Sequence, residues 1–414
     1  MITSAIITLT LAFMMTATDS SSNVTVSPSS VVFSGADFVR FHNSARTSFR
    51  AMDRQWAFYS DSQAHIWYAT SVDGVTWQLY DTRKAIDYFS SYIFDYLAAD
   101  TNGTDAFVIS RLTPYSPGFS ISEIQLHYGR LSIDGTILWR GDFKVTSGIG
   151  GSCCYSTSYL RLDTSSNPFV SISNSTGTFV AWSIGDYSRW NVLELDKEPN
   201  DVTSLAQLSN GQMYIAYAST GSNTMFGRLW NGTGWEKQEV VTTSQFENPG
   251  LSRVSLYVEK RNDIVAFYQG DCWVACAYSI ERTTRSFSSS TWSVPRTVLN
   301  ASSQNIQLFT ITKDYRTNSY FLTTYGESKG LASISTFVEI RGSLRRVDQF
   351  SMNVSACGCS GGFPSLTSDL LSSNISGSGR DAFNVYYVMA GGNISGWLFL
   401  SQTFTITRHI RNDA

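Results

Sequence analysis

The sequence has little charge of either sign. Asp, Glu, Lys and Arg make up 15% of its 414 residues, and the formal net charge is −3. Binding to nucleic acid or to an anionic membrane through electrostatics needs an excess of Lys and Arg, so neither partner class is expected. Hydrophobic residues make up 42% and aromatic residues 14%. This content is enough to bury a large core and argues against extended disorder.

The common motifs of cofactor and metal chemistry are also missing. The chain contains no G-x-S-x-G motif, no P-loop and no dinucleotide fingerprint. Its histidines are scattered without the spacing of metal ligands: His42, His65, His127 and His409. We therefore expect no cofactor and no metal site.

Long apolar runs are absent beyond the N-terminus. Residues 1–18 are uncharged, and the run from Ala5 to Met15 has the length of a signal peptide's hydrophobic segment but lacks its basic flank. It is shorter than the ~20 residues that span a bilayer. We expect a cleaved signal peptide, with a membrane anchor or a strand donated to another subunit as alternatives. Residues 19–35 are expected to form a Ser/Thr-rich lead-in that could supply a closing strand, and residues 36–410 the folded domain.

Sequons and cysteines favour a secreted or cell-surface protein. N-x-S/T sequons mark expected glycosylation sites, and an even number of cysteines in an exported chain favours disulfides. The sequons begin at Asn23, Asn102, Asn174, Asn231, Asn300, Asn353, Asn374 and Asn393. The cysteines form three close pairs: Cys153 with Cys154, Cys272 with Cys276, and Cys357 with Cys359.

The pairing of these cysteines stays open. On one straight strand the Cα atoms of Cys272 and Cys276 would lie ~13 Å apart, whereas a disulfide tolerates ~7 Å. Either the chain bends there or the bonds run between the pairs.

Helical periodicity is absent, and short runs of Val, Ile, Tyr, Phe, Trp and Thr broken by Gly, Asn, Ser and Asp indicate an all-β protein. A strand order recurs, with a Trp after the third-strand turn. Five copies carry this marker: Trp77, Trp139, Trp190, Trp235 and Trp292. Two further units are read at 304–350 and 362–410.

Spacing of ~40–50 residues predicts one β-propeller of four-stranded blades, with seven blades favoured and six as the alternative. Residues 30–34 or 403–410 could complete the last blade. Two or three β-sandwiches are the competing fold, but they would not explain the recurrent Trp.

The stretch "SVDGVTW" at 71–77 follows the strand-like "HIWYAT" and has the pattern S-x-D-G-x-T-W. Here the sequence resembles the sialidase-like, BNR-repeat propellers, whose Asp-box has this pattern. The resemblance is clear over 54–80 and weaker at "SIDGTILW". It implies a structural turn between the third and fourth strands of a blade, in which each residue has a structural role: Ser71, Asp73, Gly74, Thr76 and Trp77.

The resemblance also implies a ligand face opposite these turns, formed by the connections from second to third strands and from blade to blade. All six cysteines fall on that face. The connections expected there are 147–158, 196–201, 244–250, 268–272 and 353–363. Disulfides would hold these loops ready for binding, or would only tie down long connections.

Enzymes of this family hold a substrate carboxylate with three arginines and add an acid, a base and a tyrosine nucleophile. On the predicted inner strands the arginine candidates are Arg40, Arg161 and Arg253. Asp53 or Asp95 could be the acid, Glu247 the base, and Tyr257 or Tyr325 the nucleophile. Against this reading, the F/Y-R-I-P motif is missing, since Arg40 is followed by Phe41 and His42.

Three functions follow from this reading. The favoured one is a non-catalytic extracellular propeller that recognises glycans or a surface protein, because Tyr and Trp rings stack on sugar faces. An exo-glycosidase of the sialidase type is the second, and a self-assembling structural subunit of a cell envelope or surface filament is the third.

Overall fold

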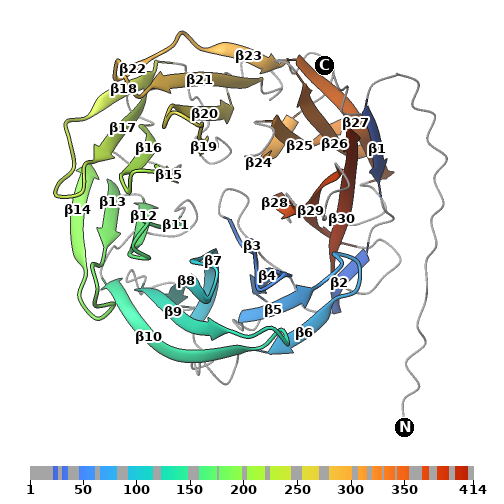
Figure 1. The fold of residues 1–414 in the computed structure, drawn as a ribbon, viewed down its shortest axis with the longest axis horizontal. Coiled ribbons are helices and arrows are strands. Elements are labelled where there is room, and N and C mark those ends of the chain that lie inside the picture. Colours follow the sequence, from blue (N-terminus) through green and yellow to red (C-terminus); the bar gives the residue numbers. More distant parts are fainter. Residues whose placement is uncertain are drawn as a thin grey trace, which may run out of the picture.

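Short β-branched and aromatic runs become strands throughout the part of the chain that the computed structural model describes. The strands form small antiparallel sheets arranged in a ring around a central axis (Figure 1). The described residues are 22–26, 30–35, 46–60, 66–81, 92–114, 123–147, 158–174, 177–197, 203–219, 224–243, 254–269, 279–300, 306–314, 319–328, 331–340, 343–353, 366–372, 380–390 and 397–408.

The described strands fall into seven hydrogen-bonded sheets, and in six of these the strands pair in chain order from the centre outward. The first is β3 (Ser48–Ala51), β4 (Arg54–Ser60), β5 (Ile66–Ser71) and β6 (Gln78–Asp81). The second is β7 (Tyr92–Thr101), β8 (Asp105–Pro114), β9 (Glu123–Leu131) and β10 (Ile137–Ser147). The third is β11 (Ser158–Leu162), β12 (Pro168–Asn174), β13 (Gly177–Trp182) and β14 (Asn191–Asp196).

The same order continues through the next three sheets. The fourth is β15 (Thr203–Gln207), β16 (Met213–Ser219), β17 (Thr224–Trp230) and β18 (Glu239–Thr242). The fifth is β19 (Val254–Val258), β20 (Ile264–Gln269) and β21 (Ile280–Ser286), with β22 (Thr291–Trp292) and β23 (Arg296–Leu299) both on its outer edge. The sixth is β24 (Ile306–Asp314), β25 (Ser319–Ser328), β26 (Leu331–Ile340) and β27 (Ser343–Asn353).

The remaining sheet joins the two ends of the chain. It contains β28 (Leu366–Ser372), β29 (Arg380–Ala390) and β30 (Trp397–Arg408), and its outer edge comes from β1 (Ser22–Val26) and β2 (Ser30–Gly35). Both N-terminal strands pair antiparallel with β30, β1 with Phe404–Arg408 and β2 with Trp397–Ser401. The N-terminal segment therefore supplies the outer strands of the sheet that β28, β29 and β30 begin.

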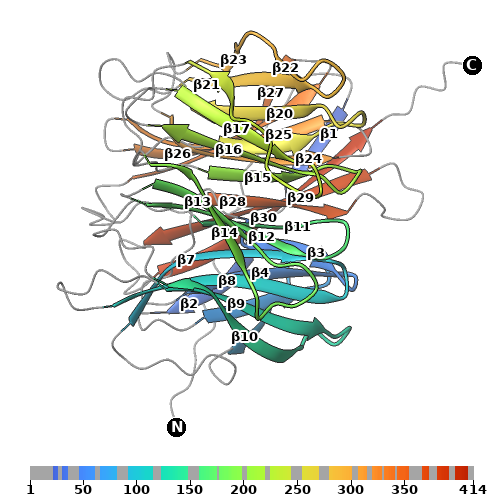
Figure 2. The same ribbon diagram turned by 90° about the vertical axis from the view of Figure 1, so that its left-hand side faces the viewer.

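Seen from the side, the strands run from one face of the ring to the other (Figure 2). Because neighbouring strands are antiparallel, the turns from first to second and from third to fourth strand share one face. We call this the hairpin face; its turns include residues 52–53 and 72–77. The connections from second to third strand and from sheet to sheet lie on the other face, which we call the loop face.

The core lies between sheets. One cluster packs Phe49 and Trp56 of the first sheet against Leu97 and Val108 of the second, all at most 2% exposed. Similar clusters join the second sheet to the third, the third to the fourth, the fourth to the fifth and the fifth to the sixth. A four-stranded sheet alone would leave both faces in water, so burial between neighbours is what stabilises each one.

Four of the marker tryptophans pack at these junctions. Trp139, Trp190, Trp235 and Trp292 each lie against the cluster that their own sheet shares with the sheet before it. The recurrent Trp therefore reports contact between blades.

The fold is an all-β propeller of four-stranded blades, as the sequence predicted, and the described strands do not form β-sandwiches. Within the described ranges, no helix is long and apolar enough to cross a membrane.

Candidate functional site

Several predicted site residues lie outside the described residues. These are Arg40, Arg253, Glu247, the six cysteines, Asn374 and Asn393. Asp95 and Tyr325 lie in β7 and β25, and Asn23, Asn174 and Asn353 in β1, β12 and β27, at positions where the side chains are not described. Asn300 is exposed directly after β23. Arg161, Asp53 and Tyr257 are the catalytic candidates whose side chains can be placed.

Arg161 lies on β11, an inner strand as predicted, and its side chain meets an acidic partner from the neighbouring sheet. The Arg161 Nη1 atom is 3.8 Å from Asp100 Oδ1 on β7. Arg46, which precedes β3, places its Nη1 2.7 Å from the same oxygen. Three sheets therefore bring one carboxylate and two guanidinium groups together, and we call Arg46, Asp100 and Arg161 the inner-strand cluster.

Backbone contacts fix the geometry of this cluster. The Leu162 N–H donates to Asp100 Oδ2 at 3.1 Å, and the Arg46 Nε–H donates to Ser48 O at 2.9 Å. The Ala99 N–H donates to Arg46 O at 2.6 Å, which ties β7 to the segment before β3. Asp100 has 9% of its side chain exposed, whereas Arg46 has 26% and Arg161 18%. The carboxylate is thus held inside, and parts of both guanidinium side chains reach solvent.

Neither Arg46 nor Asp100 was predicted. Arg46 lies in "NSARTSFR", between the predicted inner strand at Arg40 and the observed inner strand β3. Asp100 follows the apolar run Leu97–Ala99 near the end of β7, in "YLAADT". An acidic residue at the end of a predicted inner strand could have indicated a charged contact at the centre of the ring. Its partners Arg46 and Leu162 are 54 and 62 positions away in sequence, and the ring places them alongside it.

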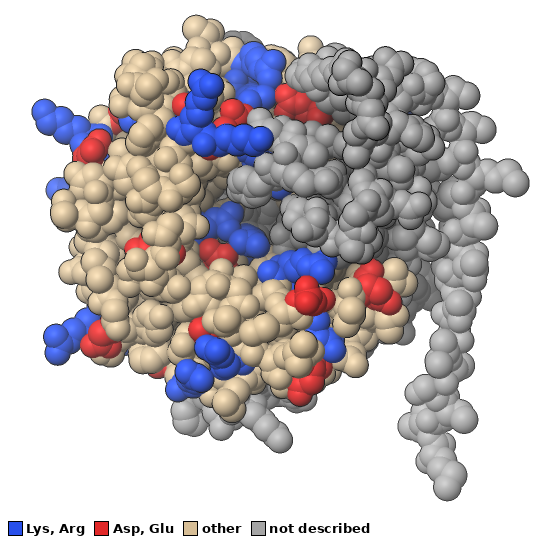
Figure 3. Space-filling view, viewed as in Figure 1, with Lys and Arg blue, Asp and Glu red and all other residues tan. Residues whose placement is uncertain are grey.

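The inner-strand cluster lies toward the hairpin face, since Asp100 and Arg161 are each one residue from the end of their strand at a first-to-second-strand turn. The resemblance had implied a ligand site on the opposite face. Lys and Arg side chains lie around the central hollow of the ring in the space-filling view, with Asp and Glu side chains beside some of them (Figure 3). The centre of the molecule therefore carries exposed basic groups.

Asp53 does not join the cluster. It occupies the two-residue turn between β3 and β4 with φ 55°, and its side chain is 95% exposed beside Arg50 at 3.8 Å. A general acid has to lie within hydrogen-bond reach of a substrate held in the site, and this carboxylate lies in open solvent on a turn. Its left-handed backbone conformation is one that Asp tolerates and that closes a tight hairpin.

Tyr257 is also away from Arg161. It lies on β19, its hydroxyl donates to Ile311 O of the next sheet, and its ring packs edge-on against Phe267 and Tyr320. The phenol is thus engaged in holding two sheets together. Of the three placed candidates, the structure brings none together with another.

A second charged cluster joins the fifth and sixth sheets. Arg282 places Nη2 3.0 Å from Glu259 Oε1 and Nη1 3.1 Å from Glu339 Oε1. The Tyr320 hydroxyl donates to Glu259 at 3.1 Å, and burial raises the pKa of Tyr320. Lys313, 3% exposed, donates from Nζ to Val258 O at 2.7 Å. Burial lowers the pKa of Lys313 to about 8, although Glu259 opposes this change.

Two consecutive hydrogen bonds link a serine on β8, a histidine on β9 and an aspartate on β10. His127 Nε2 is 2.7 Å from Ser110 Oγ, and His127 Nδ1 is 2.7 Å from Asp142 Oδ1. These distances match those of a nucleophile, base and orienting acid. However, Ser110 is 1% exposed and His127 is fully buried, so no substrate atom reaches the hydroxyl. The three residues form a chain of hydrogen bonds across the second sheet, in which the serine and the histidine are buried and Asp142 is 37% exposed.

The "SVDGVTW" turn joins β5 to β6. Asp73 Oδ1 accepts hydrogen bonds from the N–H groups of Val75 at 2.8 Å and Thr76 at 2.7 Å, and from the Ser71 hydroxyl at 2.9 Å. These bonds outweigh the effect of desolvation and lower the pKa of Asp73 to about 2. Gly74 has φ 76°, the conformation for which glycine is suited. The contacts of Asp73 are local, and each stabilises the turn.

The part of the chain that the structure describes contains no group of three or more His, Cys, Asp and Glu residues that could hold a metal ion.

Comparison with known proteins identifies the fold and no family. No protein-family model matches the chain, and no curated protein matches it. Among solved structures, an ulvan lyase of a polysaccharide lyase family aligns with a TM-score of 0.55 and 8% identity, over 89% of this chain and 95% of that one. The endosialidase of phage phi92 aligns with a TM-score of 0.50 and 8% identity, over 95% of this chain and 70% of that one. At these identities the likeness shows a shared fold.

Proposed function

We propose that this protein is an extracellular or cell-surface β-propeller that recognises acidic glycans at the centre of its ring without catalysing a reaction. The observation that carries the proposal is the meeting of Arg46 and Arg161 at Asp100 on the inner strands. The inner strands face the central hollow, around which basic side chains gather (Figure 3).

The chemistry of the inner-strand cluster suits a carboxylated sugar. A guanidinium group presents a planar array of N–H donors that matches a carboxylate or two neighbouring hydroxyl groups. The Arg161 guanidinium also lies 5.6 Å from the centre of the Tyr159 ring, which limits its movement. Asp100 orients both arginines before a ligand arrives, so less side-chain entropy is lost on binding.

The structural neighbours support the ligand class coarsely. The ulvan lyase and the endosialidase are, by name, proteins that act on glycans, and both share this fold. The aromatic content of 14% supplies rings for sugar contacts, although many of these rings belong to the core.

The placed catalytic candidates favour binding over hydrolysis. Asp53 is in open solvent on a hairpin turn, and the Tyr257 hydroxyl is bonded to Ile311 O. A hydrolase of the sialidase type would need an acid and a nucleophile beside the arginines.

The test is a glycan array that compares sialosides and uronate oligosaccharides with neutral oligosaccharides. We expect binding to the carboxylated sugars, reduced about tenfold in Arg161→Ala through loss of a charge-assisted contact. Arg189→Ala is the matched control, because Arg189 is on the third sheet too but is 89% exposed on an outer turn. Arg161→Lys keeps the positive charge but removes the planar pair of N–H donors, so it tests whether binding depends on the guanidinium geometry or on charge alone. Equal binding by wild type and Arg161→Ala would overturn the proposal.

An exo-glycosidase of the sialidase type is the second candidate. The observation in its favour is that Arg161 on β11 and Arg46, before β3, both contact Asp100 on β7. Fluorogenic sialosides incubated with the same purified protein test it. Turnover that Arg161→Ala abolishes would replace the binding proposal with the enzymatic one.

A further inference from the structure

Two identical Asn-Gly-Thr tripeptides form turns in this protein. Asn102 begins the turn between β7 and β8, and Asn231 begins the turn after β17. In the first, Asn102 Oδ1 accepts from Thr104 N at 3.0 Å and Thr104 Oγ1 at 3.1 Å. In the second, Asn231 Oδ1 accepts from Thr233 N at 3.0 Å and Thr233 Oγ1 at 2.9 Å. The two sequons therefore share one local conformation.

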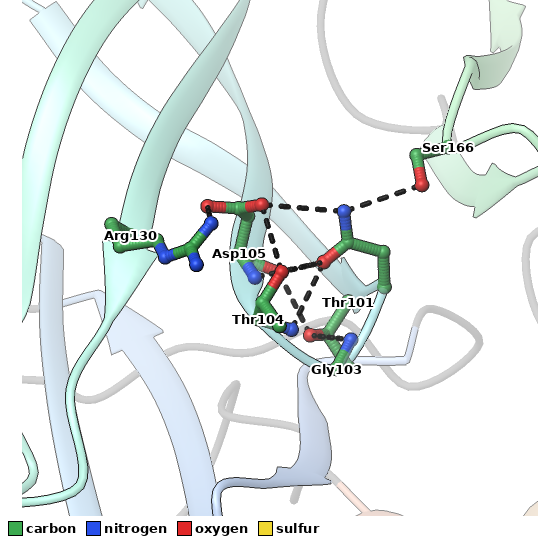
Figure 4. Close-up of polar contacts among 7 residues, drawn as sticks. Thr101, Gly103, Thr104, Asp105, Arg130 and Ser166 are labelled. Atoms are coloured by element: carbon green, nitrogen blue, oxygen red, sulfur yellow. Dashed lines mark hydrogen bonds and ion pairs between the residues drawn. The ribbon is translucent and has the colours of Figure 1, made fainter.

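They differ at the side-chain nitrogen. Asn102 Nδ2 donates to Asp105 Oδ2 at 3.3 Å and to Ser166 Oγ at 3.2 Å (Figure 4). Ser166 belongs to the turn between β11 and β12, so this second bond links two blades. Both N–H bonds of the Asn102 amide are thus in use.

Asn231 Nδ2 makes no hydrogen bond to any residue that the structure describes. Its orientation is fixed, because Oδ1 also accepts from Gly234 N at 3.0 Å and a nitrogen could not accept from these donors. The surroundings are open, since a β-carbon on Gly232 or Gly234 would have no atom within 4 Å. The Asn231 side chain is exposed, and its amide hydrogens are not used by the turn.

We propose that Asn231 carries an N-linked glycan in the folded, secreted protein and that Asn102, in the same tripeptide, excludes one. The proposal rests on the extracellular part of the proposed function. In the reaction, Nδ2 attacks the anomeric carbon of a polyprenyl-diphosphate-linked oligosaccharide supplied by the host. The bond from that carbon to the diphosphate oxygen breaks, the diphosphate leaves with its electron pair, and one amide proton passes to a base of the host transferase.

The consequences for the two sites are opposite. At Asn231 the amide hydrogen that the sugar replaces makes no hydrogen bond to a described residue, and Asn231 is exposed. At Asn102 the sugar would replace a proton that is bonded to Asp105 or Ser166, and would separate the turns of the two blades. Chains modified at Asn102 before folding would complete the ring poorly and be lost from the secreted fraction.

The experiment is secretion from a eukaryotic host with an added signal peptide, so that the experiment itself imposes export. Enzymatic deglycosylation in heavy-oxygen water converts each occupied Asn to labelled Asp, and mass spectrometry of peptides gives the occupancy of each site. We expect Asn231 to be mostly occupied and Asn102 to be occupied about tenfold less, as expected from the loss of one or two hydrogen bonds. Equal occupancy of the two sites, or an unmodified Asn231, would overturn the proposal.

Two variants test the reason for the difference. Asn231→Asp should remove one glycan without changing the melting temperature, because Asp134 and Asp186 accept the same bonds in equivalent turns. Ser166→Gly removes one partner of Asn102 Nδ2 and suits the φ of 67° at this position, so occupancy of Asn102 should rise. No rise would show that this contact does not protect Asn102. A glycan array on the same preparation tests the binding function separately, because site occupancy does not depend on ligand binding.

Discussion

Tyr214 passes directly over Gly227 on the neighbouring strand, so closely that a β-carbon on Gly227 would lie 2.0 Å from the phenolic oxygen. The Tyr214 hydroxyl donates to Glu239, whose carboxylate also accepts from Arg285 Nε at 2.6 Å and Arg285 Nη2 at 3.2 Å. Burial raises the pKa of Tyr214 well above its usual range, so the hydroxyl remains a donor. Glycine at 227 thus lets a tyrosine cross its sheet and join the fourth sheet to the fifth.

Replacing this glycine should destabilise the protein. Gly227→Ala forces the Tyr214 ring from its position and should lower the free energy of unfolding by about 1–3 kcal/mol. Urea unfolding followed by Trp fluorescence measures the change. Gly234→Ala is the control, because a β-carbon there meets nothing within 4 Å, and it should cost less than about 0.5 kcal/mol. Equal effects would show that the close approach is not what requires glycine.

Asp100 should matter more to stability than its place beside a turn suggests. Asp100→Asn removes the charge that holds Arg46 and Arg161, and should cost about 2 kcal/mol through the loss of hydrogen bonds to charged groups. Asp53→Asn changes a carboxylate that is 95% exposed and should have almost no effect. Thermal unfolding of the two variants side by side distinguishes them. A neutral Asp100→Asn would mean that the two guanidinium groups are held by other contacts.

Lys313 should make stability increase with pH above about 8. Its pKa falls from 10.5 to about 8 on folding, mainly because of burial. Between these values the unfolded chain holds a proton that the folded chain has released, so stability rises by at most about 1.4 kcal/mol per pH unit. Below pH 8 both states are protonated and this gain is absent.

Urea unfolding at pH 7.5, 8.5 and 9.5 measures this slope. Lys313→Met should flatten it, whereas Lys237→Met, which removes an exposed ammonium that does not act on the pKa of Lys313, should leave the difference between pH 7.5 and 9.5 in place. A slope unchanged by Lys313→Met would contradict the assignment.

Ser110 should behave as a structural residue despite its contact with His127. Ser110→Ala leaves a fully buried His127 Nε2 without its hydrogen bond and should cost about 1–3 kcal/mol. A fluorophosphonate probe should not label the wild-type protein, because the hydroxyl is 1% exposed. Ser165→Ala, on an exposed turn, is the stability control. Labelling of Ser110 would instead show that the blade opens to admit a reagent.

The sequence predicts the architecture well because the architecture depends on local patterns. Each blade has its own apolar strands and tight turns, and the pattern found in one blade recurs in the next. The marker tryptophans follow this pattern at Trp139, Trp190, Trp235 and Trp292. The Asp73 turn is equally local, with each of its bonds made within three residues.

The inner-strand cluster could not be predicted in the same way. Arg161 was identified by its strand, but its partners come from two other blades, and Arg46 precedes a strand whose start the pattern did not reveal. Which charged side chains meet at the centre depends on the angular order and the relative heights of three sheets. Asp53 was predicted as a candidate acid from its position in the sequence, but the two-residue turn in which it lies places its carboxylate in solvent.

The pairing of β1 and β2 with β30 sets the order in which a nascent chain can complete its ring. Val26 pairs with Phe404, so β1 cannot pair until β30 has been synthesised. At ordinary synthesis rates that interval is roughly 20–75 s. During it, the open edge of β1 and β2 is available to other chains, and ring closure across almost the whole sequence is expected to be a slow step. A ribosome-bound chain that lacks only its final strand should therefore need a chaperone more than the finished protein does.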